Sequence, residues 1–303
     1  MTVARTPYGS VPGVLLRELS DLGLDAEEVY AGVQRAIAED VPTEDVTSAA
    51  TIPATDHAVG DFTARGDGVV AGLAVAELVL VYVAGPAAEV HRHVSDGARV
   101  RRGDVLVTVS GPTGLLLTAE RTALNYLCHL SGIATLTARW VEAVAGTRAR
   151  VRDTRKTVPG HRHLAKYAVR AGGGVNHRVS LSDQALVKDN HVLAAGGVVP
   201  AYEAVRRAYP GLPVQVEVTD LDQLHELLAV GAEQILLDNM TTEQMTEAVA
   251  ITGGRAALEA SGGLTLDRAR EVAGTGVDYI AVGALTHSAP VLDVAMDLRS
   301  SGT

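Results

Sequence analysis

The sequence predicts an α/β protein with two domains, the second of which is a parallel α/β barrel. From about residue 140 onward, short β-branched runs alternate with amphipathic helical patterns, whereas the first 115 residues lack this alternation. The chain has 303 residues, of which 47% are hydrophobic and 3% aromatic. This length suits about two domains, whose cores must be built from Leu, Val, Ile and Ala.

The N-terminal region predicts a separate domain of mixed helices and strands. Helical periodicity occurs in residues 13–23, 25–40 and 75–83. Residues 58–72 and 99–111 have the pattern of strands joined by glycine turns. Residues 115–146 then predict one long helix, or two helices with a break at Gly132, that joins the domains.

The C-terminal region repeats a strand, a turn and a helix about every 20 residues. Its apolar runs cover residues 214–218, 234–239, 256–263 and 277–285. Short buried strands that alternate with helices form a parallel sheet, which closes into a barrel or stays doubly wound. Polar residues near the strand ends favour the barrel, because barrel enzymes place their chemistry there. These residues are Glu217, Asp238, Glu259 and Ser261.

We expect four segments along the chain. Residues 1–12 form an N-terminal extension, residues 13–130 the first domain, and residues 131–287 the barrel. Residues 288–303 are candidates to pack back onto the first domain.

The composition excludes several classes of protein. A formal net charge of -10 with few aromatic residues does not suit a nucleic-acid binder. The longest apolar run, residues 70–85, contains Glu77 and is too short to span a membrane. The single cysteine, Cys128, lies in an apolar helical run, where we expect a buried structural thiol, and it suits a reducing cytoplasm.

A basic segment interrupts this acidic chain. From Arg148 to Arg178 there are nine Lys or Arg residues and one acid, Asp153. Three histidines and the triple glycine Gly172–Gly174 lie in the same stretch, and the glycines would let the backbone approach a ligand closely. Cations gathered in one stretch of an acidic protein indicate a local site for an anion.

Two glycine turns follow late strands of the predicted barrel. Residues 258–263 end in Ser261, Gly262 and Gly263, and residues 282–285 contain Gly283. Backbone amides in such turns, next to the N-terminus of a helix, bind phosphate in barrel enzymes. Ordinary strand-to-helix turns are the alternative, because glycine ends many strands.

Charged residues follow other strands as well. Glu217 and Asp238 each end an apolar run, where a carboxylate is costly unless it serves a ligand, a metal or a partner. They fit Mg²⁺ held mainly through a phosphate substrate, or they neutralise the basic segment. Lys188 fits either a Schiff-base aldolase or a phosphate-binding cation, and spacing does not separate the two.

Several long stretches of the chain match one pattern. They are ERTALNYLCHLSGIATLTARWV (120–141), DTRKTVPGHRHLAKYAVRAGGGVNHRVSLSDQALVKDNH (153–191), EVTDLDQL (217–224), LLDNM (236–240), EASGGL (259–264) and DYIAVGALTHS (278–288). Together they resemble quinolinate phosphoribosyltransferases, over roughly residues 13–298. Residues 38–48, AEDVPTEDVTS, are similar to an early acidic motif of that family, although their PTE departs from the usual glycine nearby.

The resemblance implies a fold, an assembly and a reaction. The fold would be an N-terminal α/β sandwich domain followed by an open, seven-stranded α/β barrel of the TIM type. The assembly would be a homodimer, or dimers of higher order, in which one subunit's N-terminal domain closes the other's barrel. The reaction would convert quinolinate and phosphoribosyl pyrophosphate into nicotinate mononucleotide, pyrophosphate and CO₂, with Mg²⁺, in de novo NAD biosynthesis. Both substrates are polyanions, which explains the basic segment, because the planar fork of arginine suits carboxylates.

The resemblance also assigns roles to residues. Quinolinate would be held by Arg121, Arg155, Lys156, His177, Arg178 and Lys188, with Arg121 contributed to the neighbouring subunit's site. The sugar donor would be held by Lys156, Lys188, Glu217, Asp238, Ser261, Gly262, Gly263, Gly283 and His287. Lys156, Lys188, Glu217 and Asp238 are the candidate catalytic residues, and the two acids would hold Mg²⁺ largely through substrate and water. Arg148, Arg150 and Lys166 are expected at the surface or in dimer contacts.

Other functions remain open at this point. A related protein linked to molybdenum transport shares the implied fold, and a nicotinate-using phosphoribosyltransferase is a more distant relative. The arginine set, suited to two carboxylates, favours quinolinate over either. A Schiff-base aldolase on the same barrel is the rival enzyme class. Outside enzymes, the rival is a regulator that binds a phosphosugar, against which Lys156, Glu217 and Asp238 argue.

Overall fold

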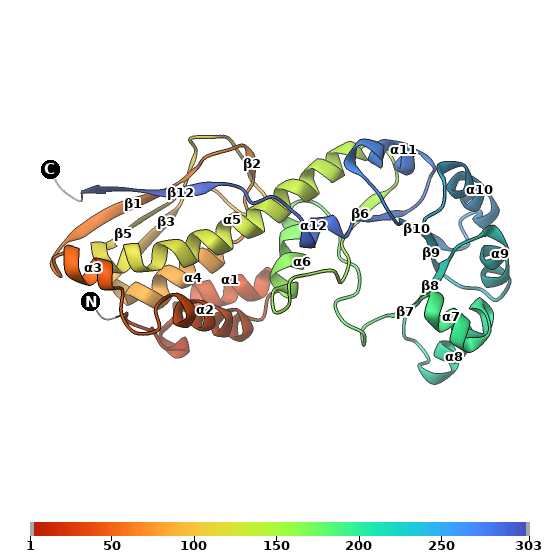
Figure 1. The fold of residues 1–303 in the computed structure, drawn as a ribbon, viewed down its shortest axis with the longest axis horizontal. Helices are drawn as coiled ribbons and strands as arrows, with labels where there is room; N and C mark the ends of the chain where they lie inside the picture. The colour runs from red at the N-terminus through yellow and green to blue at the C-terminus, as the bar shows by residue number, and fades with distance from the viewer. Residues whose placement is uncertain (1–2, 301–303) are drawn as a thin grey trace. The chain divides into compact units, whose positions relative to one another are not determined.

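The chain folds into two compact units, described for residues 3–300 by a computed structural model (Figure 1). Within these residues, the first unit comprises the chain up to Leu136, residues His163–Gly172 and the segment from Ala289 onward. The second unit comprises Thr137–Arg162 and Gly173–Ser288. The predicted limit after residue 130 falls inside helix α5 (Thr113–Ala143), whose residues belong to both units.

A four-stranded antiparallel sheet forms one layer of the first unit. Its order is β12 (Val294–Ser300), β1 (His57–Ala64), β5 (Val105–Pro112) and β3 (Glu89–Arg92). Alternate residues of β1 are buried, as expected for a strand with one face on a core. The last strand, β12, pairs along β1 from Ala58 opposite Ser300 to Ala64 opposite Val294. Strand β12 therefore completes the sheet of the first unit. Short strands β2 (Gly68–Val69) and β4 (Arg99–Val100) pair separately.

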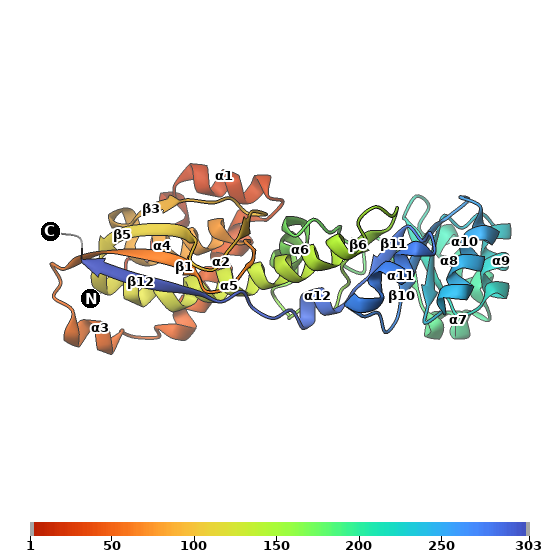
Figure 2. The same ribbon diagram turned by 90° about the horizontal axis from the view of Figure 1, so that it is seen from above.

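Helices cover one face of this sheet. Helix α4 (Leu73–Ala84) is buried at every residue except Glu77, and it lies between the sheet and helices α1 (Gly13–Asp21) and α2 (Ala26–Asp40) (Figures 1 and 2). Asp96 accepts the backbone N–H groups of Gly72 and Leu73, at 3.1 and 3.2 Å, and so caps the start of α4. The remaining elements before β3 are α3 (Val46–Thr51) and the 3₁₀ turns η1 (Tyr8–Ser10) and η2 (Gly85–Ala87).

Helix α5 runs through Gly132 without a break. A side chain at Gly132 would meet the backbone of the C-terminal segment, because a Cβ there would lie 2.3 Å from the carbonyl oxygen of Pro290. Gly132 therefore permits close packing, and the predicted alternative of two helices is wrong. Helix α6 (Arg162–Ala171) buries Lys166, which is 2% exposed within a single subunit, so the expectation that it lies at the surface or in a dimer contact is also wrong.

A parallel sheet forms the second unit. Its order is β6 (Arg150–Arg152), β11 (Tyr279–Ala281), β10 (Ala257–Ser261), β9 (Gln234–Asp238), β8 (Val214–Val218) and β7 (Ala185–Val187). A single parallel bridge between Arg152 and Val175 adds a seventh segment beside β6. Within the described residues the outer strands β6 and β7 are not paired with each other, so the barrel is open, as predicted.

Helices connect these strands on the outside of the sheet (Figure 1). They are α7 (Asp189–Ala195), α8 (Val198–Ala208), α9 (Leu221–Ala229), α10 (Thr242–Thr252), η3 (Leu266–Arg268), α11 (Ala269–Gly274) and α12 (Ala284–His287). Side chains of Asp220 and Thr241 cap α9 and α10, which explains where these helices begin. No helix in residues 3–300 combines the length and the apolar character needed to cross a bilayer.

Candidate active site

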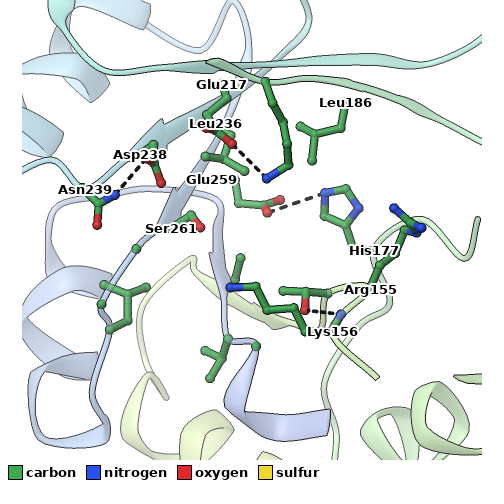
Figure 3. Close-up of a pocket in the computed structure, with 18 of the residues that line it drawn as sticks. Arg155, Lys156, His177, Leu186, Glu217, Leu236, Asp238, Asn239, Glu259 and Ser261 are labelled. Atoms are coloured by element: carbon green, nitrogen blue, oxygen red, sulfur yellow. Dashed lines mark hydrogen bonds and ion pairs between the residues drawn. The ribbon is translucent and has the colours of Figure 1, made fainter. Parts of the chain in front are cut away.

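One cavity of about 810 Å³ lies at the carboxyl ends of the parallel strands. Twelve of the thirteen residues assigned by resemblance line it: Arg155, Lys156, His177, Arg178, Lys188, Glu217, Asp238, Ser261, Gly262, Gly263, Gly283 and His287. Thr154, Leu186, Leu236, Asn239 and Glu259 also contribute to the wall (Figure 3). The thirteenth residue, Arg121, is an exposed residue of α5 in the first unit.

Arginine and lysine side chains form one wall of the cavity. Burial lowers the pKa of Arg178 most, and the charge of Arg155 lowers it further. Arg155 Nε is buried and has no hydrogen-bond partner within the described residues. Two positive charges that lie close together repel each other, and a buried donor without a partner costs free energy. A bound anion would relieve both. This wall therefore suits a ligand with carboxylates.

The backbone that carries these cations is pinned by Arg162, at the start of α6. Its guanidinium donates to Thr157 Oγ1 at 3.1 Å, to the carbonyl oxygen of Val179 at 3.1 Å and to that of Arg155 at 3.4 Å. These bonds tie the loop after β6 to the segment after Arg178. Sequence reasoning did not assign Arg162 a role, because its three partners are recognisable only in the folded chain.

Lys156 is held by a different contact. The hydroxyl of Thr286 on α12 donates to the carbonyl oxygen of Lys156 at 2.7 Å. Gly283, just before α12, leaves room for the lysine stem, because a Cβ there would lie 3.0 Å from Lys156 Cδ. The position of Lys156 thus depends on the last βα turn of the barrel.

Two carboxylates occupy neighbouring strands in the opposite wall. Glu217 on β8 faces Lys188, with 3.4 Å between Oε2 and Nζ, and Asp238 ends β9. Burial raises the pKa of Glu217, the charge of Lys188 lowers it, and the charge of Asp238 raises it again. Within the described residues no group of three or more His, Cys, Asp or Glu side chains could hold a metal ion. Two carboxylates without a further protein ligand leave most of a metal's coordination shell to substrate and water.

The turn after β10 packs tightly against the turn after β9. Gly262 has a φ of +99°, and a Cβ there would lie 2.2 Å from Asn239 Oδ1. The backbone N–H of Asn239 donates to the carbonyl oxygen of Ser261 at 2.9 Å. Glycine is therefore required at residue 262. Because glycine has no side chain, the backbone of this turn itself lines the cavity. Such a turn leaves room for a phosphate group.

A hydrogen-bonded chain of buried polar side chains includes two residues of the cavity wall, His177 and Glu259, and sequence reasoning missed it as a unit. Arg152 Nη1 donates to Glu259 Oε2 at 2.7 Å, and Gln215 Nε2 donates to the same oxygen at 3.2 Å. His177 Nε2 lies 2.7 Å from Gln215 Oε1. Glu259 was noted only as a polar residue near the end of its strand, and Gln215 is a polar residue inside the apolar run 214–218. A polar residue inside an apolar strand was the sequence signal that could have indicated a buried hydrogen bond here.

Asp153 anchors the segment that leads to His177. Its carboxylate accepts from the backbone N–H of His177 at 2.8 Å and from Asn176 Nδ2 at 2.6 Å. The side chain is fully buried. The one acid of the basic segment therefore shapes the site.

Comparisons with known proteins identify the family of this chain. A family model described as "Quinolinate phosphoribosyl transferase, C-terminal domain" matches residues 133–297, and the corresponding N-terminal domain matches residues 45–131. A nicotinate-nucleotide pyrophosphorylase (carboxylating) from Mycobacterium leprae is 53% identical over 285 residues, which are 92% of this chain and 100% of that protein. A probable enzyme of the same name from Bacillus subtilis is 38% identical over 87% of this chain and 91% of its own length.

Solved structures give the same result. NadC from Streptococcus pyogenes matches with a TM-score of 0.87 and 38% identity, over 95% of this chain and 98% of that one. The nicotinate-nucleotide pyrophosphorylase from Francisella tularensis matches with a TM-score of 0.86 and 35% identity, over 90% of this chain and 96% of that one. With both domains matched, and with the matched C-terminal domain carrying the cavity, the chain belongs to the quinolinate phosphoribosyltransferase family.

Proposed function

We propose that this chain is a nicotinate-nucleotide pyrophosphorylase (carboxylating). It would transfer the phosphoribosyl group of phosphoribosyl pyrophosphate to quinolinate and form nicotinate mononucleotide, pyrophosphate and CO₂, in de novo NAD biosynthesis. One observation carries the proposal: a single cavity joins the cations Arg155 and Arg178 to the carboxylates Glu217 and Asp238. A reaction between two polyanions that develops a sugar cation needs both walls.

Different parts of the cavity bind different parts of the two substrates. Quinolinate, with two adjacent carboxylates, lies against Arg155, Arg178 and His177, with Lys156 and Lys188 nearby. The 5′-phosphate of the donor takes the turn of Ser261, Gly262 and Gly263, together with Gly283 and His287. The ribose then lies between these groups and the carboxylates. This placement rests on which residues share the cavity and on the charge of each wall.

The chemistry follows from the charges. The bond between C1′ and the pyrophosphate oxygen breaks, its electron pair leaves with pyrophosphate, and C1′ becomes cationic. Glu217 and Asp238 stabilise that cation, while Lys156 and Lys188 stabilise the departing anion. The lone pair of the pyridine nitrogen forms the new bond to C1′, which makes the nitrogen positive. The bond from C2 to its carboxylate then breaks, because the electron pair left on C2 lies beside N⁺, and a proton from water replaces CO₂.

Mg²⁺ is the cofactor of this proposal. Glu217 and Asp238 supply carboxylate oxygens from adjacent strands, the ligand type that Mg²⁺ prefers, and the donor's phosphates supply more. When bound, the metal would neutralise charge on the pyrophosphate. The residues therefore fit a metal held largely through substrate and water.

Two further points belong to the same proposal. The enzyme works as a homodimer, or as dimers of higher order, in which Arg121 reaches the neighbouring subunit's site. The position of Arg121 on the exposed surface of α5 supports this. The enzyme is cytoplasmic. Its single cysteine, Cys128, supports this, because proteins of a reducing compartment rarely depend on disulfides.

A direct assay tests the proposal. Purified protein is incubated with quinolinate, phosphoribosyl pyrophosphate and MgCl₂, and nicotinate mononucleotide is measured by mass spectrometry. Product should form only when all three are present. Borohydride added during turnover should leave the protein mass unchanged, because no covalent intermediate forms. A trapped adduct at Lys188 without nucleotide product would favour an aldolase instead.

A further inference from the structure

A directional hydrogen-bond chain connects the buried carboxylate of Glu259 to the backbone of Arg178. Glu259 Oε2 accepts from Gln215 Nε2 at 3.2 Å, and Gln215 Oε1 lies 2.7 Å from His177 Nε2. At the far end, the backbone N–H of Arg178 donates to His177 Nδ1 over 2.7 Å. Arg152 Nη1 anchors the near end by donating to Glu259 Oε2 at 2.7 Å.

Both ends of the chain permit only one direction. A backbone N–H can only donate, so His177 Nδ1 must accept, and the ring proton must lie on Nε2. A carboxylate can only accept, so the Gln215 amide must turn its NH₂ toward Glu259 and its oxygen toward His177. The two requirements agree, and they define His177 as the Nε2–H tautomer.

The surroundings of Nε2 reinforce this tautomer. Glu259 Oε1 lies 3.6 Å from His177 Nε2, has no hydrogen-bond partner of its own, and is a second acceptor facing the same nitrogen (Figure 3). Glu259 and Gln215 are each 1% exposed, and His177 is 8% exposed. Reversing the direction of these hydrogen bonds would place buried donors against donors and acceptors against acceptors, which costs free energy. Arg152 is itself held by stacking on the ring of Tyr279, 3.8 Å from the ring centroid.

We infer that Glu259 is a positioning residue for the quinolinate side of the site. It acts through Gln215 to hold His177 in the Nε2–H tautomer, and His177 in turn fixes the backbone amide of Arg178. Asp153 holds the amide of His177 at 2.8 Å, so the two successive amides that precede the Arg178 side chain are both fixed. The inference deepens the proposed function and rests on it for the statement that Arg178 binds quinolinate.

Glu259→Gln keeps the shape of the side chain and replaces one acceptor oxygen with a donor NH₂ group. The substitution therefore tests the direction of the hydrogen bonds alone. Arg152 and Gln215 both donate to Glu259 Oε2, so the new amide oxygen takes that place and the new NH₂ takes the place of Oε1, 3.6 Å from His177 Nε2. A donor in that place opposes a proton on Nε2 and favours the ring proton on Nδ1. That proton opposes the N–H of Arg178, so the substitution should break the last bond of the chain.

The tautomer is measured directly. In protein labelled with ¹⁵N-histidine, long-range ¹H–¹⁵N spectra distinguish a protonated ring nitrogen from an unprotonated one, and His177→Asn assigns the signal by its loss. Wild type should show His177 protonated at Nε2, and Glu259→Gln should shift the population toward Nδ1–H. Asp278→Asn is the matched control: it removes another carboxylate of the same unit, which accepts the N–H of Leu258 at 2.9 Å outside the cavity. That control should leave the His177 signal unchanged.

Kinetics supply the second readout. Glu259→Gln should raise KM for quinolinate roughly three- to tenfold, the change equivalent to one net hydrogen bond, and leave KM for phosphoribosyl pyrophosphate nearly unchanged. A wild-type His177 protonated at Nδ1 would overturn the inference without any variant. So would a Glu259→Gln variant that folds with the wild-type tautomer. If the tautomer shifts as expected but wild type forms no nicotinate mononucleotide, the hydrogen-bond chain stands and the proposed function fails.

Discussion

Lys188 and Glu217 form an ion pair in the cavity wall, with Nζ 3.4 Å from Oε2. Burial raises the pKa of Glu217 most, the charge of Lys188 lowers it, and the charge of Asp238, at the end of the next strand, raises it again. Two carboxylates therefore share this wall with one lysine, which pairs with Glu217, and the wall keeps an excess of negative charge. That excess suits a cation: the sugar at C1′ as pyrophosphate leaves, and Mg²⁺ on the pyrophosphate.

Removing either carboxylate should reduce turnover far more than quinolinate affinity. For Glu217→Ala and Asp238→Ala we expect kcat to fall roughly 100-fold or more, the usual cost of one charge-stabilising group. Steady-state kinetics measure this, with unfolding temperatures as the control for folding. Near-normal kcat in both folded variants would remove these residues from the mechanism.

Nicotinic acid should be a very poor substrate. It lacks the 2-carboxylate, so the buried Nε of Arg155 would stay without a hydrogen-bond partner. We expect kcat/KM to fall by at least about 100-fold relative to quinolinate, because unpaired buried donors carry a large penalty. Comparable values for the two acids would contradict the assignment of this wall to two carboxylates.

Arg162 and Thr286 should separate the two substrates. Arg162 holds the backbone near Arg155 and Val179, whereas Thr286 holds that of Lys156. Arg162→Gln should raise KM for quinolinate about tenfold, and Thr286→Val should raise KM mainly for phosphoribosyl pyrophosphate, by about threefold. Each variant is the control for the other. If both variants changed both KM values equally, the two loops would not act separately.

Arg121 should act on the neighbouring subunit. Arg121→Ala and Lys156→Ala homodimers should each be nearly inactive. If Arg121 acts in trans, a heterodimer of the two variants carries both lesions in one site and leaves the other intact, so it should recover about half the wild-type activity when the sites are independent. The alternative, an exposed arginine paired with Glu120, is worth at most about 1 kcal/mol. A heterodimer as inactive as its parents, with subunit exchange shown to be slow, would reject the shared site.

Much of the second unit was predictable because its strands are short apolar runs. The predicted run at 214–218 is β8, and strands β9, β10 and β11 lie inside the others. Their carboxyl ends meet at one edge, so Glu217, Asp238 and Ser261 could be brought together from sequence alone.

Other features depend on contacts between distant residues. Strand β3 (EVHR) has no apolar alternation, and the pairing of β12 with β1 joins Val294 to Ala64 across most of the chain. Gly132 looked like a helix break because nothing in the sequence places Pro290 against it. The chain from Glu259 to His177 spans three separate segments, and its direction depends on hydrogen bonds that appear only after folding.

The most direct test of the central claim follows the carboxylate that leaves. Quinolinate labelled with ¹³C in its 2-carboxylate is incubated with the protein, phosphoribosyl pyrophosphate and MgCl₂, and labelled CO₂ and nicotinate mononucleotide are measured together. We predict that both form in a 1:1 ratio, that the nucleotide carries no label, and that both form roughly 100-fold more slowly, or slower still, in Glu217→Ala. Labelled nucleotide that retains both carboxylates, or CO₂ released without nucleotide, would contradict this assignment.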